Sequence, residues 1–259
     1  MSIECIRRPI VYGVNTVDID PYWDSNWCNK LLINKIKPKS HLNLVLDVDQ
    51  TMVCTTGNSE DFSQVFTDPK YKALRRRIYN IKTDPEFLSD TKTEITPSEP
   101  GEIFGILRPH LYQFLDFAFR YFENIYIWSS GDREYILPLC DHIFNVFPKK
   151  PRDIFTGDKC PVVDKKGNLG KPLKLLYEQY PDMNAANTII IDDLLQNGKS
   201  NPENLIKIPK YDPKPTIEDF SKDDTAFLHL IEFFKQPLVK DCADIKDVDK
   251  SNIFKNNRL

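Results

Sequence analysis

One segment of the chain carries the strongest structural signal: Leu42-Asn43-Leu44-Val45-Leu46-Asp47-Val48-Asp49-Gln50-Thr51-Met52-Val53. An almost unbroken apolar run ends at Asp47, and Asp49 and Thr51 follow at alternate positions. Such a run is typical of a strand that is buried on both faces, as in a parallel sheet. Because ligands bind beyond the carboxyl ends of the strands in open α/β sheets, we expect Asp47 and Asp49 to lie at an active site.

A second pair of aspartates with the same spacing, Asp247 and Asp249, tests how much the spacing alone means. Charged residues precede this pair and no apolar strand leads into it. Aspartates at a strand end can also form a simple turn, because their carboxylates bond to nearby backbone amides. Whether Asp47 and Asp49 are catalytic therefore depends on the other motifs of the chain.

Composition bounds the class of protein. The 259 residues are 41% hydrophobic and 28% charged, which suits one large globular domain or one domain with an insertion. A net charge of −3 gives no global attraction for nucleic acid, so direct nucleic-acid binding is not expected. The basic run Arg75–Arg77 could still form a local patch, although a solvated helix face is the simpler interpretation.

Other features favour a soluble intracellular protein. No apolar run approaches the ~18 residues that a membrane span needs, and residues 1–10 lack the apolar core of a signal peptide. The six cysteines form no Cys-x-x-Cys pair, which is typical of packed thiols in a reducing compartment. No membrane partner is therefore expected.

Apolar patterns predict strands that alternate with helices, and this order indicates an α/β fold with a parallel sheet. Pro109 suits the first turn of a helix, whereas Pro138 should kink its helix or mark its true start. The expected strands are 42–47, 125–128, 188–191 and 205–208, and the expected helices are 71–79, 108–122, 133–144, a short one through Leu173 and Tyr177, and 227–234.

The chain is expected to divide into three parts. Aromatic residues in the segment 1–40 predict that it packs on the core, and 41–240 should form the main domain. About fifty residues at 55–105 exceed an ordinary connection, so they predict an insertion over the active site. The polar segment 241–259 is expected to be a flexible tail.

Three expected strand ends carry reactive groups: Asp47 with Asp49, then Ser129, then Asp192 with Asp193. Four carboxylates at one sheet edge cannot all stay ionised without a cation. Oxygen ligands in this number suit Mg²⁺, which keeps waters and shares substrate phosphate.

Two further groups complete a site for phosphoryl chemistry. Ser129 can donate a hydrogen bond to a phosphate oxygen, and Lys171 can place a positive charge beside the same oxygens. Catalysis in such a site consists mainly of positioning and charge stabilisation.

The segment Asp47–Val53 resembles the signature of haloacid-dehalogenase-superfamily phosphotransferases. More narrowly, it resembles the phosphatases of the RNA polymerase II C-terminal domain, the NLI-interacting-factor-like or small CTD phosphatase family. The resemblance covers roughly Leu42 to Phe234, and the other motifs in the family's order are Arg108-Pro109, Trp128-Ser129-Ser130, Tyr135, Gly170-Lys171-Pro172-Leu173 and Ile191-Asp192-Asp193.

This resemblance implies a Rossmann-like core and a Mg²⁺-dependent phosphatase of phosphoserine or phosphothreonine. Asp47 would be the nucleophile that forms an aspartyl-phosphate. Asp49 would protonate the leaving oxygen and then activate water, while its backbone carbonyl binds the metal. Lys171 would hold the phosphate and Asp47, and the metal ligands would be Asp47, Asp49, Asp192 and Asp193.

The resemblance also assigns supporting residues. Ser129 stands where the family usually has threonine, and with Thr51 it would contact the substrate phosphate. Thr51 and Arg108 are candidates to hold the reacting groups, whereas Tyr135 is expected to pack rather than to take part in the chemistry. Gln50 and Met52 depart from the family's glutamate and leucine, but neither position supplies a reacting group.

Alternatives remain for the substrate and for turnover. The protein substrate implied by the resemblance is a phosphoprotein such as the RNA polymerase II C-terminal domain, which suggests a role in transcription. That substrate would locate the chain in the nucleus or, for a viral protein, in the host cell cytoplasm or nucleus. The same chemistry could serve small phosphomonoesters or polynucleotide 3′-phosphate ends. A member of the fold that only binds phosphopeptides is the third interpretation.

Overall fold

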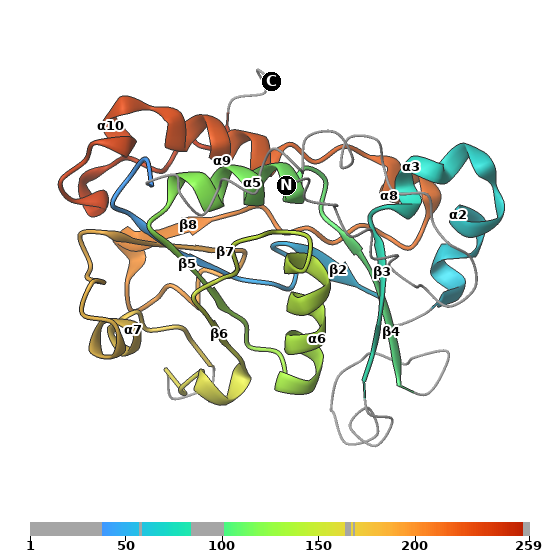
Figure 1. The fold of residues 1–259 in the computed structure, drawn as a ribbon, viewed down its shortest axis with the longest axis horizontal. Helices are drawn as coiled ribbons and strands as arrows, with labels where there is room; N and C mark the ends of the chain where they lie inside the picture. The colour runs from blue at the N-terminus through green and yellow to red at the C-terminus, as the bar shows by residue number, and fades with distance from the viewer. Residues whose placement is uncertain (1–37, 57–58, 84–100, 164–166, 168, 256–259) are drawn as a thin grey trace, which may run out of the picture. The chain divides into compact units, whose positions relative to one another are not determined.

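The computed structural model of the chain describes residues 38–56, 59–83, 101–163, 167 and 169–255 (Figure 1). The segment 1–37, most of the stretch expected to pack on the core, lies outside the described residues. Residues 84–100 of the expected insertion and residues 256–259 of the expected tail lie outside them as well.

The central element is a five-stranded parallel sheet in the order β6-β5-β1-β7-β8, which confirms the predicted α/β class. Every neighbouring pair in it is parallel, and four of its strands match the four predicted ones. The bounds are β1 (Asn43–Leu46), β5 (Asn124–Trp128), β6 (Asp153–Phe155), β7 (Thr188–Asp192) and β8 (Leu205–Lys207).

Strand β1 lies in the middle of this sheet because its side chains are apolar on both faces. All four of its residues are buried, and Val45 is in register with Tyr126 of β5 and Ile190 of β7. These three pack in one apolar cluster with Leu176 of α7 (Lys174–Gln179). Burial on two faces is what an uninterrupted apolar run predicts for a parallel strand.

The opposite side of the sheet is covered by α5 (Leu111–Tyr121) and α9 (Ala226–Lys235). The rings of Phe114 and Phe227 stack between these two helices with centroids 4.8 Å apart. Figure 1 shows α5 and α9 side by side on one side of the strands and α7 on the other. The parallel sheet is therefore the middle layer of a helix–sheet–helix arrangement.

A second, antiparallel sheet was not predicted. It has the order β2 (Val53–Thr55), β4 (Glu102–Leu107), β3 (Ile78–Lys82). The predicted helix 71–79 was wrong beyond Arg75, because Ile78 and Tyr79 pair with β4 instead of continuing α3 (Lys72–Arg75). An apolar cluster beneath this sheet includes Phe62 and Phe220, whose rings stack 5.0 Å apart.

Two arginines of the run 75–77 are tied to other protein groups, so the interpretation as a solvated helix face was wrong for Arg75 and Arg77, whereas Arg76 is exposed. Arg75 donates to the carbonyl oxygens of Val65 and Asp68 at 2.6 and 3.0 Å. Arg77 donates to two more carbonyl oxygens and, at 2.6 Å, to the Tyr211 hydroxyl. Arg75 thus ties α3 to the α2 segment (Ser63–Thr67), and Arg77 ties strand β4 to α8 (Ile217–Ser221).

Two proline predictions are decided by the helix bounds. α5 begins at Leu111, not in the turn of Pro109, because His110 takes a left-handed backbone conformation with φ of 61°. α6 runs from Arg133 to Phe144 with Pro138 inside it, so Pro138 does not mark its start. The other helices, several of them single 3₁₀ turns, are η2 (Ser59–Phe62), α2 (Ser63–Thr67), η3 (Pro69–Tyr71), η4 (Gly157–Lys159), η5 (Pro202–Asn204), α8 (Ile217–Ser221), α10 (Pro237–Lys240) and η6 (Ile245–Asp247).

Residues 241–255 are packed, unlike the flexible tail expected there. Ile245, Val248 and Ile253 are buried, and the Ile245 amide donates to the carbonyl oxygen of Ala186 at 2.8 Å. The polar composition concealed these three apolar anchors. Over the described part of the chain, every helix is too short or too polar to cross a bilayer.

Candidate active site

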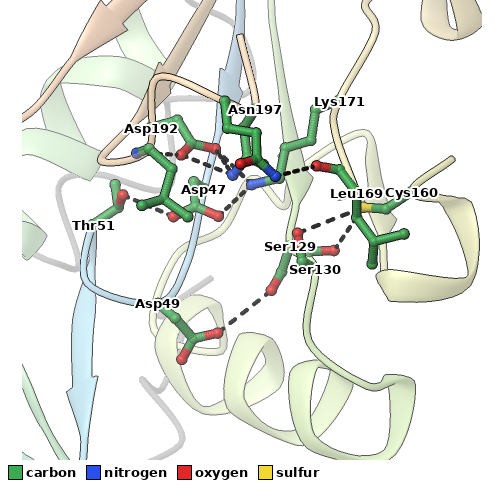
Figure 2. A network of polar contacts seen from close by, with 12 residues as sticks. Asp47, Asp49, Thr51, Ser129, Ser130, Cys160, Leu169, Lys171, Asp192 and Asn197 are labelled. Carbon is green, nitrogen blue, oxygen red and sulfur yellow. Dashed lines mark hydrogen bonds and ion pairs between the residues drawn. The ribbon is translucent and has the colours of Figure 1, made fainter. Parts of the chain in front are cut away.

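Three strand ends meet at one edge of the parallel sheet. Asp47 directly follows β1, Ser129 directly follows β5, and Asp192 is the last residue of β7. Because β1 pairs with both β5 and β7, these side chains lie next to one another, as Figure 2 shows. The convergence inferred from the sequence is therefore present in the fold.

The fully buried ammonium of Lys171 links two of these strand ends. It forms an ion pair with Asp47 Oδ1 and lies 2.7 Å from Asp192 Oδ2. The Thr51 hydroxyl, also buried, donates to the other Asp47 oxygen at 2.8 Å. This contact agrees with Thr51 as a residue that holds the reacting groups, and its expected contact with the substrate phosphate stays a prediction.

The site holds more negative charge than Lys171 can balance. Burial raises the pKa of Asp47 to about 7 even though Lys171 opposes this shift, and the nearby Asp192 and Asp49 raise it further. Burial alone would lower the pKa of Lys171, but Asp47 and Asp192 hold it above its ordinary value. An additional cation would therefore favour the ionised form of Asp47.

The carboxylates are arranged to accept such a cation. Oxygen atoms of Asp47, Asp192 and Asp193 all lie within 4.8 Å of one another. Asp193 is buried, and its Oδ2 has no hydrogen-bond partner among the described residues. Burial, followed by the charge of Asp192, raises the pKa of Asp193. An orphaned carboxylate oxygen beside two others fits a divalent cation.

Asn197, which the sequence reasoning missed, completes the surroundings of Asp192. Its side-chain amide donates to both carboxylate oxygens of Asp192 at 2.9 Å, and the backbone amide of Leu194 donates to Oδ1 at 2.8 Å. No motif spacing pointed to Asn197, because its role depends on the turn after β7 folding back over the strand end.

Asp49 points away from this cluster, toward Ser129 (Figure 2). Its Oδ1 accepts a 2.6 Å hydrogen bond from the hydroxyl of Tyr135, a residue that was expected to pack rather than to take part in the chemistry. The Ser129 hydroxyl makes a long 3.5 Å contact with Oδ2 and accepts from the Gly131 amide at 2.9 Å. The two aspartates of the opening segment thus occupy separate environments, and the pKa of Asp49 is raised mainly by burial.

The turn after β1, which carries Asp49 and Thr51, is stabilised by backbone hydrogen bonds and by Arg108. The Val48 carbonyl oxygen accepts from the amides of Met52 and Val53 at 2.7 and 3.2 Å. Gln50 takes a left-handed conformation with φ of 59°. Arg108, fully buried, donates to the Thr51 carbonyl oxygen at 3.2 Å, so it supports the turn and contacts none of the site carboxylates.

Comparison with known protein families identifies the chain. The family described as NLI interacting factor-like phosphatase matches residues 42–246. The chain belongs to this family. The match spans both sheets and every candidate site residue, and it confirms the resemblance drawn from the segment Asp47–Val53.

Similar individual proteins include two from viruses. A CTD phosphatase-like protein, 355R, of Invertebrate iridescent virus 3 is 25% identical over 203 residues, which cover 74% of this chain and 96% of the viral protein. Its namesake in Invertebrate iridescent virus 6 is 26% identical over 176 residues, or 65% of this chain and 85% of that protein.

A solved structure shares the fold. The fission yeast RNA polymerase II CTD phosphatase Fcp1, bound to beryllium fluoride, superposes with a TM-score of 0.51 at 20% identity. The superposition covers 83% of this chain and 56% of the yeast structure, so this chain spans little more than half of it. The family's haloacid-dehalogenase-type core is thus the fold of the described residues.

Proposed function

We propose that the chain is a Mg²⁺-dependent phosphoprotein phosphatase that acts on phosphoserine or phosphothreonine through an aspartyl-phosphate. The observation that carries the proposal is the contrast between two aspartates. Asp47 is held by Lys171 and Thr51 beside a cation-binding cluster, whereas Asp49 is held apart by Tyr135. A nucleophile and a proton donor need such different surroundings.

In the first step, Asp47 Oδ would attack the phosphorus and the bond to the leaving serine or threonine oxygen would break. Asp49 would give its proton to that oxygen, so the alcohol leaves neutral. Lys171 would offset negative charge on Asp47 and on the phosphoryl oxygens. The Ser129 hydroxyl, which donates toward Asp49 Oδ2, would bind one of those phosphoryl oxygens.

In the second step, Asp49, now ionised, would take a proton from water. The resulting hydroxide oxygen would attack the phosphorus of the aspartyl-phosphate and release inorganic phosphate, which regenerates the Asp47 carboxylate. Thr51 and Lys171 hold this carboxylate from both oxygens, so it would return to the same position for the next cycle.

Mg²⁺ fits the oxygen-only donor set of Asp47, Asp192 and Asp193, with the Asp49 carbonyl as a further proposed ligand. When bound, it would neutralise charge on the phosphoryl group and orient it toward Asp47. Asn197 and Leu194 would keep the Asp192 carboxylate turned toward that position.

The substrate proposed is a phosphorylated protein tail such as the C-terminal domain of RNA polymerase II. This part rests on family membership and on the names of the viral and yeast relatives. The engagement of Arg75 and Arg77 with protein groups argues against a basic patch for polynucleotides. With that substrate, the protein would act at sites of transcription in the nucleus or in virus-infected cells.

A substrate panel tests the proposal. Phosphate release would be measured with Mg²⁺ and with excess chelator on a phosphoserine heptad peptide, a nucleoside monophosphate and 3′-phosphorylated DNA. We expect the highest kcat/KM on the phosphopeptide and loss of activity with chelator. Preference for DNA with a steep salt dependence would contradict the substrate assignment, and turnover unaffected by chelator would contradict the metal assignment.

A further inference from the structure

Three hydroxyl groups form a continuous chain that ends on Asp49. The Tyr135 hydroxyl, on α6, lies 2.6 Å from Asp49 Oδ1. The Thr55 hydroxyl, at the end of β2, lies 2.5 Å from the Tyr135 oxygen, and the Tyr79 hydroxyl, on β3, lies 2.7 Å from the Thr55 oxygen. These hydrogen bonds therefore connect Asp49, the candidate proton donor, to strand β3 at one edge of the second sheet.

The donors in this chain can be assigned from the number of protons available. Each hydroxyl donates one hydrogen bond. Tyr135 gives its proton to Asp49, so Thr55 must donate to Tyr135, and Tyr79 must then donate to Thr55. Every bond points toward the carboxylate, and bonds aligned in this way strengthen one another in a buried environment.

Gly105 provides the space that the hydrogen-bonded hydroxyl groups of Tyr79 and Thr55 need. It lies on β4 between the other two strands, in register with both Thr55 and Tyr79. A Cβ atom at Gly105 would come within 2.3 Å of the Tyr79 hydroxyl oxygen and within 2.7 Å of the Cys54 carbonyl oxygen. The Tyr79 side chain can cross β4 to reach Thr55 only because residue 105 has no side chain.

We propose that Tyr135, Thr55 and Tyr79 are positioning residues that fix the Asp49 carboxylate, with Oδ1 occupied and Oδ2 left to face the leaving oxygen of the substrate. The inference rests on the proposed role of Asp49 as proton donor. Oδ1 accepts the short bond from Tyr135, whereas among the described residues Oδ2 has the long 3.5 Å contact with Ser129, so Oδ2 is the oxygen available for proton transfer. The second sheet thereby takes part in the reaction without contacting the phosphoryl group.

The choice of leaving group separates positioning from general stability. The alcohol of phosphoserine is a poor leaving group and needs the proton from Asp49, whereas the phenolate of p-nitrophenyl phosphate leaves with little protonation. Loss of the correct Asp49 orientation should therefore slow the first substrate much more than the second. A variant whose fold is merely damaged should slow both equally.

The test compares kcat/KM on a phosphoserine peptide and on p-nitrophenyl phosphate for Tyr135→Phe, Thr55→Val, Thr55→Ser and Tyr79→Phe. The ratio kcat/KM reports the step in which the alcohol leaves, whereas hydrolysis of the aspartyl-phosphate, in which Asp49 also acts, is common to both substrates. General acid catalysis is worth about 10²–10⁴-fold, so partial misorientation in Tyr135→Phe should lower kcat/KM on the peptide about tenfold and on p-nitrophenyl phosphate less than about twofold. Thr55→Val should show the same selective loss. Thr55→Ser, which retains the hydroxyl, should have nearly the wild-type kcat/KM on the peptide. Tyr79→Phe should show a smaller loss of the same kind.

Tyr121→Phe serves as the matched control. It also removes a buried tyrosine hydroxyl, but Tyr121 lies beside Ser40 at the opposite end of β1 from Asp47. It should leave the ratio of the two kcat/KM values unchanged. Equal losses of kcat/KM on both substrates in Tyr135→Phe, or identical behaviour of Thr55→Val and Thr55→Ser, would overturn the positioning role of these hydroxyl groups. Either result would leave the phosphatase proposal intact. A wild-type protein that releases phosphate from neither substrate would overturn the proposed function and this inference with it.

Discussion

The side-chain amide of Asn197 lies 2.9 Å from each carboxylate oxygen of Asp192. Both residues are buried, and Asp192 also pairs with Lys171. The backbone amide of Leu194 is the third partner of Asp192. A carboxylate with these three partners cannot rotate freely, so its orientation toward Asp47 and Asp193 is set before any cation binds. Such outer contacts typically change metal affinity by about 10–100-fold when they are removed.

Replacement of Asn197 by Ala should weaken Mg²⁺ binding by about 10–100-fold, because Asp192 loses its orienting donor. The measurement is the rise in unfolding temperature as Mg²⁺ is added, since a ligand that binds the native state stabilises it by mass action. The exposed Asn252→Ala variant is the control and should follow the wild-type titration. If the Mg²⁺ concentration at the midpoint of the titration is the same for Asn197→Ala as for the wild type, metal binding by Asp192 does not depend on this amide.

Replacement of Asp224 by Ala should destabilise the fold by about 3 kcal/mol, because it leaves the buried guanidinium of Arg108 without its charge partner. The two residues share hydrogen bonds of 2.9 Å to each Asp224 oxygen, and the Arg108 side chain is fully buried. Urea unfolding gives the free energy. Glu232→Ala breaks the exposed pair with Lys235 and should cost less than about 1 kcal/mol. Equal effects of the two changes would contradict the structural role of Arg108.

His142 should make stability depend on pH. Burial lowers its pKa to about 4, although Asp141 partly opposes the shift, whereas an unfolded histidine titrates near ~6.5. As the pH falls from about 6.5 toward 4, the unfolded chain binds a proton that the native chain does not, so stability is lost. At pH 5 the loss should be about 1–2 kcal/mol relative to pH 7.5.

The check on His142 is urea unfolding at pH 7.5 and pH 5 for the wild type and His142→Gln. The variant should lose less stability between the two pH values, because residue 142 no longer titrates. His41→Gln, which replaces an exposed histidine, should behave like the wild type. If His142→Gln loses as much stability as the wild type, the ring is not protected from protonation.

The main sheet and the meeting of its reactive groups could be predicted because the signals are local. β1, β5 and β7 are buried on both faces, so their sequences are nearly continuous apolar runs. Once those strands are placed, the positions of Asp47, Ser129 and Asp192 follow from the parallel geometry. β6 was missed because it offers only two successive apolar residues, Ile154 and Phe155, after the charged Asp153.

The second sheet and two contacts of the site could not be predicted because they depend on distant partners. Strand β3 follows a short helix directly and is specified by its pairing with β4, some twenty residues later. Tyr135 is one of the motif residues, but nothing in the sequence pointed to its contact with Asp49, and Asn197 lies in a segment with no distinctive spacing. Their targets, Asp49 and Asp192, are identified only when the loops are placed in space.

The most direct test of the account is Mg²⁺-dependent phosphate release from a phosphoserine peptide by wild type, Asp47→Asn and Asp247→Asn, measured side by side. Asp247 belongs to the second aspartate pair and is exposed on η6. We expect Asp47→Asn to lose at least about 10³-fold in kcat, because it removes the nucleophile, and Asp247→Asn to retain wild-type activity. Undiminished turnover by Asp47→Asn would contradict the central claim that Asp47 attacks the phosphorus.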